Sequence, residues 1–185
     1  MNAPSTLEFA LAGLIRQKPQ SGYDLRKTFS TTAMRHFSDS PGSIYPALRR
    51  LEARGWIVAH SPADRAADPR RRQAFAITVE GEAQLIAWVC RTVTRDDAVW
   101  RSQELLLRFA FMDSIVPRTV TLRFLDQLEA ALSAYVGELR AEFRRSGSQI
   151  PLNTGLLALE SGIEGMEAHL DWARRTRAQL SEVSR

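Results

Sequence analysis

The residues of this sequence that are best equipped for chemistry lie in the segment 42–54, which mixes polar, aromatic and cationic side chains. At about 100° per residue, Ile44, Leu48 and Leu51 fall on one side of a helix, and this spacing predicts a buried stripe. The opposite side carries Ser43, Tyr45, Pro46, Arg49 and Arg50. Arginine recognises guanine edges and phosphates, and short polar or aromatic side chains suit the base edges of a major groove. The pattern indicates a helix that reads duplex DNA, although a solvated helix face with two arginines would explain the same spacing.

A second cationic group, Arg70-Arg71-Arg72, lies between two segments that favour β-structure. Residues 56–60 are rich in β-formers, and residues 73–77 show the period-2 alternation of a half-buried strand. Two strands around a long basic loop predict a β-hairpin with an extended tip. A basic wing of this kind can neutralise phosphates along the DNA backbone or enter the minor groove. The hairpin therefore strengthens the DNA interpretation of the segment 42–54.

Short helices are expected to position these groups. Helical spacing predicts three of them, over residues 6–17, 22–33 and 42–54. Gly55 stands where a left-handed residue would end the third helix, and three short helices in so few residues are typical of a helix-turn-helix. A fourth helix, capped by Thr78 and extending to Val93, is expected after the hairpin.

The second half of the chain is predicted to be wholly helical, with helices over residues 98–113, 117–145 and 154–181. The last two carry apolar stripes at alternating spacings of three and four, which only Arg177 interrupts in the final helix. Such stripes predict an antiparallel coiled coil or arms that wrap a partner chain. The stripe residues assigned to dimerisation are Leu125, Leu128, Leu132, Leu156, Leu159, Ile163, Met166 and Leu170. The predicted fold is mainly α with a small β-hairpin: a winged helix-turn-helix DNA-binding domain over 1–95 and a helical dimerisation domain over 96–185.

Composition places the chain among ordinary globular proteins, with 44% hydrophobic and 25% charged residues. No apolar run approaches the roughly 20 residues that cross a bilayer, and the N-terminus lacks the features of a secretory signal. The single cysteine, Cys90, cannot form an internal disulfide, so a cytoplasmic location without membrane contact is expected. Residues 1–95 hold 14 basic and 8 acidic side chains, whereas residues 96–185 hold 11 and 13. The first half is therefore the part expected to meet a polyanion.

The sequence contains no recognisable catalytic constellation. His36, His60 and His169 lie in separate elements and lack the spacing of a metal site. No glycine-rich phosphate loop follows a strand, and no serine has the context of a nucleophile elbow. The sequence therefore predicts neither an enzyme nor a bound metal or cofactor. The alternative that stays open is a winged-helix module that binds another protein without binding specific DNA.

Several motifs, taken in this order, resemble the PadR family of transcriptional regulators. Over the first 95 residues they are Leu11-Ala12-Gly13-Leu14-Ile15, Ser21-Gly22-Tyr23-Asp24-Leu25, Gly42-Ser43-Ile44-Tyr45-Pro46-Ala47-Leu48-Arg49-Arg50-Leu51-Glu52 with Gly55-Trp56-Ile57, and Ile77-Thr78-Val79-Glu80-Gly81. The remaining chain resembles the subfamily with a long helical C-terminal domain, through its helical pattern and Leu157-Ala158-Leu159-Glu160-Ser161-Gly162-Ile163.

The resemblance implies a homodimer whose C-terminal helices cross between subunits and whose recognition helices and wings bind a pseudo-palindromic operator. It also implies a repressor that a small-molecule effector releases from DNA. The residues that it places at the DNA are Tyr23, Ser43, Tyr45, Pro46, Arg49 and Arg50, with Arg70, Arg71 and Arg72 as wing contacts. Aromatic side chains near a dimer seam sandwich planar effectors in some family members. Trp88, Trp100 and Trp172 are therefore a candidate effector pocket, beside the simpler interpretation of plain packing.

Overall fold

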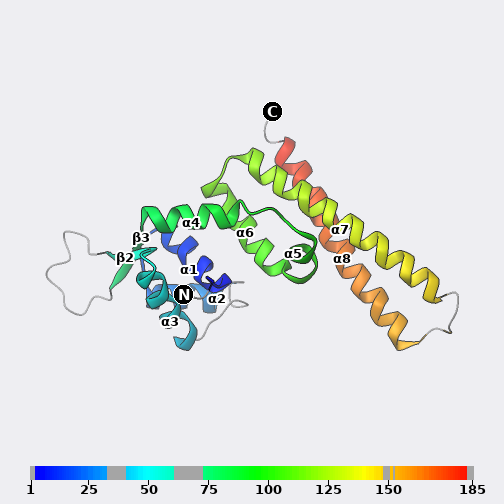
Figure 1. Cartoon of the computed structure of the whole chain (residues 1–185), viewed down its shortest axis with the longest axis horizontal. Helices are drawn as coiled ribbons and strands as arrows, with labels where there is room; N and C mark the ends of the chain where they lie inside the picture. Colours follow the sequence, from blue (N-terminus) through cyan, green and yellow to red (C-terminus); the bar gives the residue numbers. More distant parts are fainter. Residues whose placement is uncertain (1–2, 33–40, 61–72, 148–150, 152, 183–185) are drawn as a thin grey trace. The chain divides into compact units, whose positions relative to one another are not determined.

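The computed structural model of the chain describes residues 3–32, 41–60, 73–147, 151 and 153–182. The chain forms two compact units, residues 1–89 and 90–185, and each is described on its own (Figure 1). The predicted fold class, mainly helical with a small β-structure, is confirmed. The predicted division after residue 95 lies slightly further along the chain, and the functions assigned to its two parts stay predictions.

Within the described residues the first unit contains four helices, and capping boxes set the starts of α1 and α2. Its helices are α1 (Thr6–Gln17), α2 (Gly22–Thr31), α3 (Pro41–Ala53) and α4 (Val79–Val89). A capping box of Ser5 and Glu8 begins α1, and the equivalent box of Ser21 and Asp24 begins α2. Each box satisfies two backbone amides that a helix start would otherwise leave without partners, so these boundaries follow from a few residues.

The end of α3 turns the chain directly into the sheet. Gly55, at φ 71°, follows the helix in the left-handed conformation. Its amide donates to the carbonyl of Glu52, and the amide of Trp56 donates to the carbonyl of Leu51, both at 2.9 Å. This pair of bonds is the Schellman motif, and it satisfies the last carbonyls of the helix. Strand β2 therefore begins at a fixed point beyond α3.

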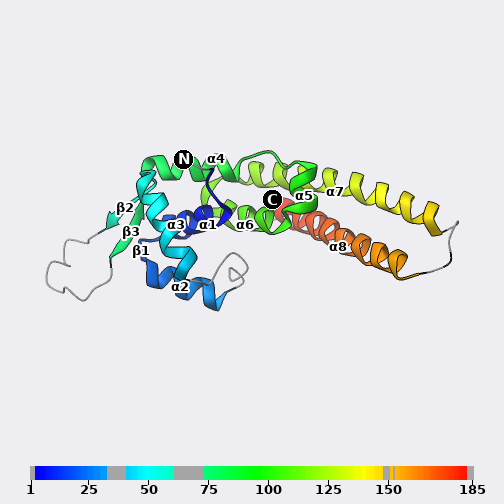
Figure 2. The ribbon, with the colours of Figure 1, turned by 60° about the horizontal axis from the view of Figure 1, so that its bottom comes forward.

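Within the described part of the chain, three short strands form one antiparallel sheet in the order β1-β3-β2 (Figure 2). Strands β2 (Ile57–His60) and β3 (Ala74–Ile77) pair with Ile57 opposite Ile77, which confirms the predicted hairpin. The intervening residues 61–72 lie outside the described residues. Strand β1 (Gln20–Ser21) was not predicted, because its two polar residues join the sheet only through backbone pairing with β3.

Two predicted helix boundaries in the middle of the chain were wrong. The helix expected to reach Val93 ends at Val89, and the amide of Val93 donates instead to Oε1 of Gln127 at 3.0 Å. The single helix expected over 98–113 is two helices, α5 (Arg95–Trp100) and α6 (Ser102–Ile115). A capping box of Thr94 and Asp97 starts α5 early, and the backbone of Arg101 leaves the helical region at φ −129° and ψ 33°.

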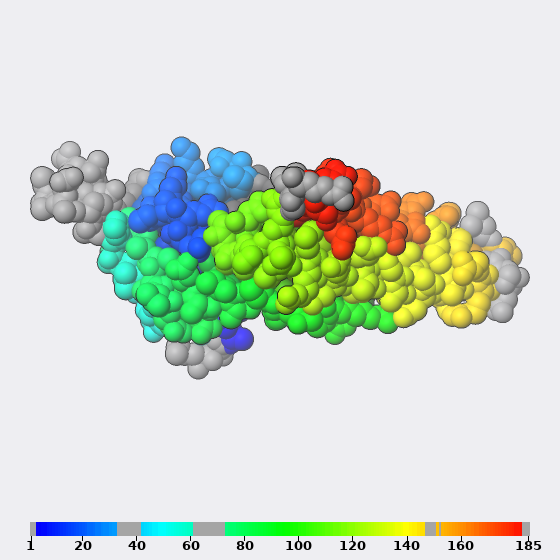
Figure 3. Space-filling view, turned by 90° about the horizontal axis from the view of Figure 1, so that it is seen from above, coloured from blue at the N-terminus to red at the C-terminus, as the bar shows by residue number. Residues whose placement is uncertain are grey.

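The second unit is completed by two long helices, α7 (Arg118–Gly147) and α8 (Thr154–Glu182), which lie in contact (Figures 1 and 3). The predicted stripe residues that are buried within this single chain are Leu125, Leu128, Leu132, Leu156, Ile163 and Leu170. Leu159 and Met166 are half-buried. The apolar seam is therefore filled inside one chain, and the dimerisation role of these residues stays a prediction.

Ion pairs along the edges of the seam join α7 to α8. Arg174 Nε lies 2.9 Å from Glu129 Oε1, and Arg177, the predicted interruption of the stripe, bonds Asp126. Further along the helices, Arg140 makes two bonds to Glu167, at 2.8 and 2.7 Å. An arginine in the stripe is tolerated because its charged end reaches a carboxylate beside the seam.

Within the residues that the structure describes, no helix is long and apolar enough to cross a membrane.

Gly81 offers a test of the packing in the first unit. A Cβ at this position would lie 2.1 Å from the carbonyl oxygen of Trp56, which is backbone and cannot rotate away. We expect Gly81→Ala to lower the free energy of unfolding by about 3 kcal/mol. The matched control is Gly137→Ala in α7, where a Cβ meets nothing within 4 Å and should raise that free energy by about 0.5–1 kcal/mol. Urea denaturation followed by circular dichroism measures both, and equal effects would contradict the close contact.

Candidate nucleic-acid interface and candidate ligand cavity

Helix α3 divides into a buried side and an exposed side as the sequence predicts. Ile44 and Leu51 are fully buried, and Leu48 is 2% exposed. The exposed side carries Ser43, Tyr45, Arg49 and Arg50, with Pro46 half-buried. Because α3 begins at Pro41, Pro46 lies inside the helix, where it has no amide to donate. The apolar side holds the helix against the first unit and leaves a polar, cationic surface toward solvent.

Tyr45 is placed by a close approach between α2 and α3. A Cβ at Gly22 would lie 2.6 Å from Cε1 of Tyr45, so the glycine leaves room for the tyrosine ring at the start of α2. Tyr23 is 37% exposed, and the guanidinium carbon of Arg26 lies 5.4 Å from its ring centroid. Arg26 thereby joins the same surface. The sequence interpretation missed it, although its position three residues after Tyr23 on a helix was a usable signal.

Arg50 has a carboxylate partner on another helix. Nε of Arg50 donates to Oε1 of Glu8 at 2.5 Å, and that interaction connects α3 to α1. Glu8 is 1% exposed, whereas the side chain of Arg50 is 52% exposed. Glu8 was also missed, since a capping glutamate gives no sequence signal of a second partner. The predicted wing contacts Arg70, Arg71 and Arg72 lie outside the described residues.

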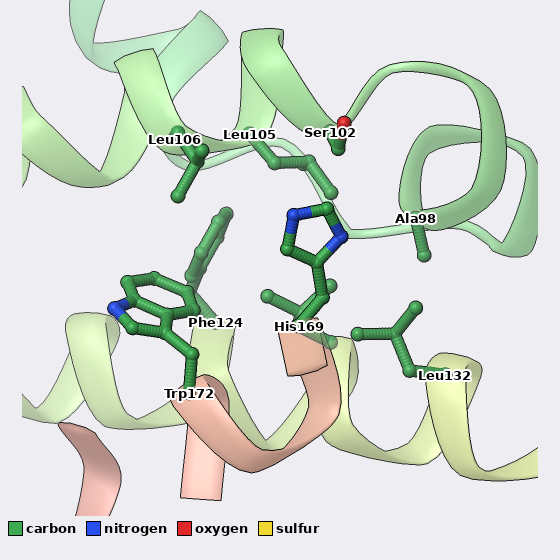
Figure 4. Close-up of a pocket in the computed structure, with 9 residues that line it drawn as sticks. Ala98, Ser102, Leu105, Leu106, Phe124, Leu132, His169 and Trp172 are labelled. Atoms are coloured by element: carbon green, nitrogen blue, oxygen red, sulfur yellow. The ribbon is translucent and has the colours of Figure 1, made fainter. Parts of the chain in front are cut away.

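The second unit contains a cavity of about 20 Å³ among α5, α6, α7 and α8. Its lining includes Leu105, Leu106, Phe124, Leu128, His169 and Trp172 (Figure 4). His169 extends from α8 toward Leu105 and Ser102, and Trp172 stands beside Phe124. Nδ1 of His169 is buried and has no hydrogen-bond partner in the described part of the chain. The arrangement is a mainly apolar, aromatic space, sized for about one water molecule, whose lining also includes the imidazole of His169 and the hydroxyl of Ser102.

The three predicted effector tryptophans occupy different surroundings. Trp172 lines the cavity and meets Phe109 edge to face, with ring centroids 5.2 Å apart. Trp88 is buried in the first unit, where its ring stacks on Phe9 at 4.6 Å. Trp100 is 77% exposed and does not line the cavity. The structure thus brings only Trp172 to the cavity.

A charged cluster lies beside the cavity. Arg108 is fully buried, donates to the carbonyl of Arg91, and has its guanidinium 5.2 Å from the ring centroid of Phe124. Burial lowers the pKa of Arg108 to about 10, and the nearby charge of Arg91 acts in the same direction. Arg91 itself donates to Asp97 at 3.0 Å and to Glu104 at 3.1 Å. The cluster fixes the segment that leads into α5.

Comparison with known proteins gives consistent matches. The model of the transcriptional regulator PadR-like family matches residues 11–87. The chain is 22% identical over 183 residues to the negative transcriptional regulator PadR of Bacillus subtilis (strain 168), covering 95% of this chain and 98% of that protein. The crystal structure of B. subtilis PadR with operator DNA has a TM-score of 0.42 and 20% identity, covering 95% of this chain and 99% of that one. The crystal structure of that protein with p-coumaric acid has a TM-score of 0.40 and 20% identity, covering 96% and 99%.

Asp97 gives a pH-dependent test of the charged cluster. Burial alone would raise the pKa of Asp97, but hydrogen bonds from Thr94 and the charge of Arg91 outweigh it and lower the pKa. The stabilisation by Asp97 is therefore complete above its ordinary pKa of about 4 and is lost as the pH falls through the lower folded-state value. We expect Asp97→Asn to cost about 2 kcal/mol at pH 7, with the difference from the wild type shrinking below about pH 4.

Urea denaturation between pH 3 and pH 7 measures this difference. The matched control is Asp96→Asn, which removes an exposed carboxylate from the same helical turn. A cost that is the same at every pH, or equal for the two variants, would contradict the assigned role.

Proposed function

Because residues 11–87 of this chain match the model of the PadR-like family of transcriptional regulators, we propose that it is a sequence-specific DNA-binding repressor whose helix α3 enters the major groove. The observation that carries this proposal is the division of α3. Its apolar side is buried in the core, while Ser43 and Tyr45 in its N-terminal half and Arg49 further along are exposed to solvent. A recognition helix needs this combination of a fixed back and a front able to bond base edges.

The working form proposed here is a homodimer on a pseudo-palindromic operator. One recognition helix reads only a few base pairs, so two copies on half-sites roughly 34 Å apart supply the required specificity. Two exposed apolar side chains of the second unit, Leu106 and Leu157, are available for association. The wing arginines Arg70–Arg72 would neutralise phosphates beside each helix. Since a repressor acts where the chromosome lies, its proposed location is the cytoplasm.

Removing Arg49 tests the proposed reading of DNA. We expect Arg49→Ala to weaken binding to the preferred duplex by about 10- to 100-fold, because a base-edge contact by arginine contributes about 1–3 kcal/mol. Replacing Arg70, Arg71 and Arg72 together by alanine should instead weaken binding to all duplexes. The slope of log affinity against log salt concentration should become shallower by about two to three, which corresponds to the loss of about two to three phosphate contacts. Fluorescence anisotropy with the gene's own upstream region and with a scrambled duplex, at two salt concentrations, measures both effects.

The control for charge is Arg175→Ala, which removes an exposed arginine from α8 in the second unit. Its effect on DNA affinity should be small. If the wild type binds both duplexes weakly and equally, the operator lies elsewhere or the chain is the alternative winged-helix module that binds a protein. An intact dimer whose operator binding survives the replacement of Arg49 and Arg70–Arg72 by alanine would contradict the proposed DNA interface.

The cavity of the second unit is the proposed effector site. Its lining combines Phe124 and Trp172 with the unpartnered Nδ1 of His169, which suits a small aromatic compound carrying a hydroxyl or carboxylate group. Such a compound exceeds a space of about 20 Å³, so binding requires a lining side chain to move. Leu106, 43% exposed, is the outermost candidate. A ligand that prefers the opened arrangement would shift the population of the regulator away from its DNA-bound form.

Trp172→Ala tests the proposed effector site. In the wild type, phenolic compounds such as p-coumaric acid, tested beside cationic aromatic compounds, are expected to weaken operator binding. In Trp172→Ala the effector concentration at half-release should rise about tenfold, while operator affinity without effector stays the same. Trp100→Ala is the matched control, since Trp100 does not line the cavity. Unchanged operator affinity across the whole panel for the wild type would remove the effector proposal and leave DNA binding standing.

A further inference from the structure

Glu8 is a buried carboxylate that serves two elements of the first unit at once. Its Oε2 accepts the backbone amide of Ser5 at 2.7 Å, which closes the capping box of α1. Its Oε1 accepts Nε of Arg50 on α3 at 2.5 Å. With Glu8 only 1% exposed, this bond fixes the inner end of a guanidinium whose side chain is half exposed.

Simple electrostatics would not favour a carboxylate such as Glu8 beside a surface that binds DNA. A carboxylate paired with a cation of a DNA-binding helix lowers the positive potential at that surface, and the DNA is a polyanion. Charge alone would therefore predict tighter DNA binding without Glu8. A compensating benefit exists if the geometry of Arg50 matters more than its net charge, because a fixed planar guanidinium loses less conformational freedom when it binds an anion.

We propose that Glu8 is a positioning residue for DNA recognition, which holds Nε of Arg50 so that Nη1 and Nη2 bind one phosphate of the specific complex. The guanidinium has five N–H donors in a rigid fork, so Nε can bind Glu8 while the two terminal nitrogens bind a phosphate. Glu8 touches no DNA in this arrangement and acts only through Arg50. The inference rests on the proposed function, since it requires a sequence-specific complex in which α3 is docked.

The chain supplies a variant that separates position from charge. Asp24 fills in α2 the capping place that Glu8 fills in α1, so aspartate closes a capping box in this same unit. Glu8→Asp keeps the negative charge and the cap but is one methylene shorter and does not reach Arg50. Glu8→Gln keeps the length and removes the charge. The matched control is Glu82→Gln, because Glu82 forms the same Nε to Oε1 bond, at 2.8 Å, with Arg16, and joins α1 to α4 rather than to α3.

The experiment compares each variant's affinity for a duplex selected from a random pool by the wild-type protein with its affinity for a scrambled duplex. We expect Glu8→Asp to lower the ratio of the two affinities about tenfold, since Arg50 is no longer held for its charge-assisted bond to phosphate. Glu8→Gln should lower the ratio less, because its amide oxygen can still accept the hydrogen bond from Nε of Arg50. Glu82→Gln should leave the ratio unchanged. Arg50→Ala should lower the ratio as much as Glu8→Asp, and the double variant Glu8→Asp with Arg50→Ala should show no further loss. Thermal melting of each variant confirms that the compared proteins are folded.

Two results overturn the inference. If both Glu8 variants behave like Glu82→Gln, Glu8 contributes charge and packing only. If the losses of Glu8→Asp and Arg50→Ala add, the two residues act independently. A wild-type protein that enriches no sequence from the pool overturns the proposed function itself and this inference with it, whereas an intact wild-type preference with an unchanged Glu8→Asp ratio overturns the inference alone.

Discussion

The burial of one side of α3 is the interaction on which the rest of the first unit depends. Ile44, Leu48 and Leu51 are almost completely removed from water, and this fixes which side chains of α3 remain outside. A rotation of the helix by one residue position would expose part of this stripe at a cost of about 25 cal/mol for each Å² of apolar surface. Specific recognition by a helix requires this kind of rigidity, because side chains distinguish between base edges only when the positions of those side chains are fixed.

Interactions of different chemical kinds preserve that orientation. The Schellman motif at Gly55 fixes where α3 ends, and the contact of Gly22 with Tyr45 fixes its distance from α2. The bond between Glu8 and Arg50 adds an ionic connection to α1. A helix held by apolar packing, backbone hydrogen bonds and an ion pair cannot shift without losing all three, so these contributions are expected to be strongly non-additive.

The sequence predicted the features that repeat and missed those that depend on a single contact. The stripe of α3, the hairpin and the long helices follow periodicity, which several residues establish together. Strand β1 has only Gln20 and Ser21, and the break at Arg101 comes from one residue's backbone, so neither leaves a periodic signal. The partnership of Glu8 with Arg50 spans 42 positions in the chain and could not be predicted from local spacing. The cavity likewise gathers residues from α5 to α8, which explains why only Trp172 of the three tryptophans lines it.

The hairpin of α7 and α8 has a consequence for how the protein is made. Because each chain fills its own seam, this arm can reach its folded form by a first-order process whose rate does not depend on protein concentration. Newly synthesised copies would therefore not expose a leucine-rich surface to aggregation while waiting for a second copy. An arm that completes itself makes this step of maturation independent of protein concentration.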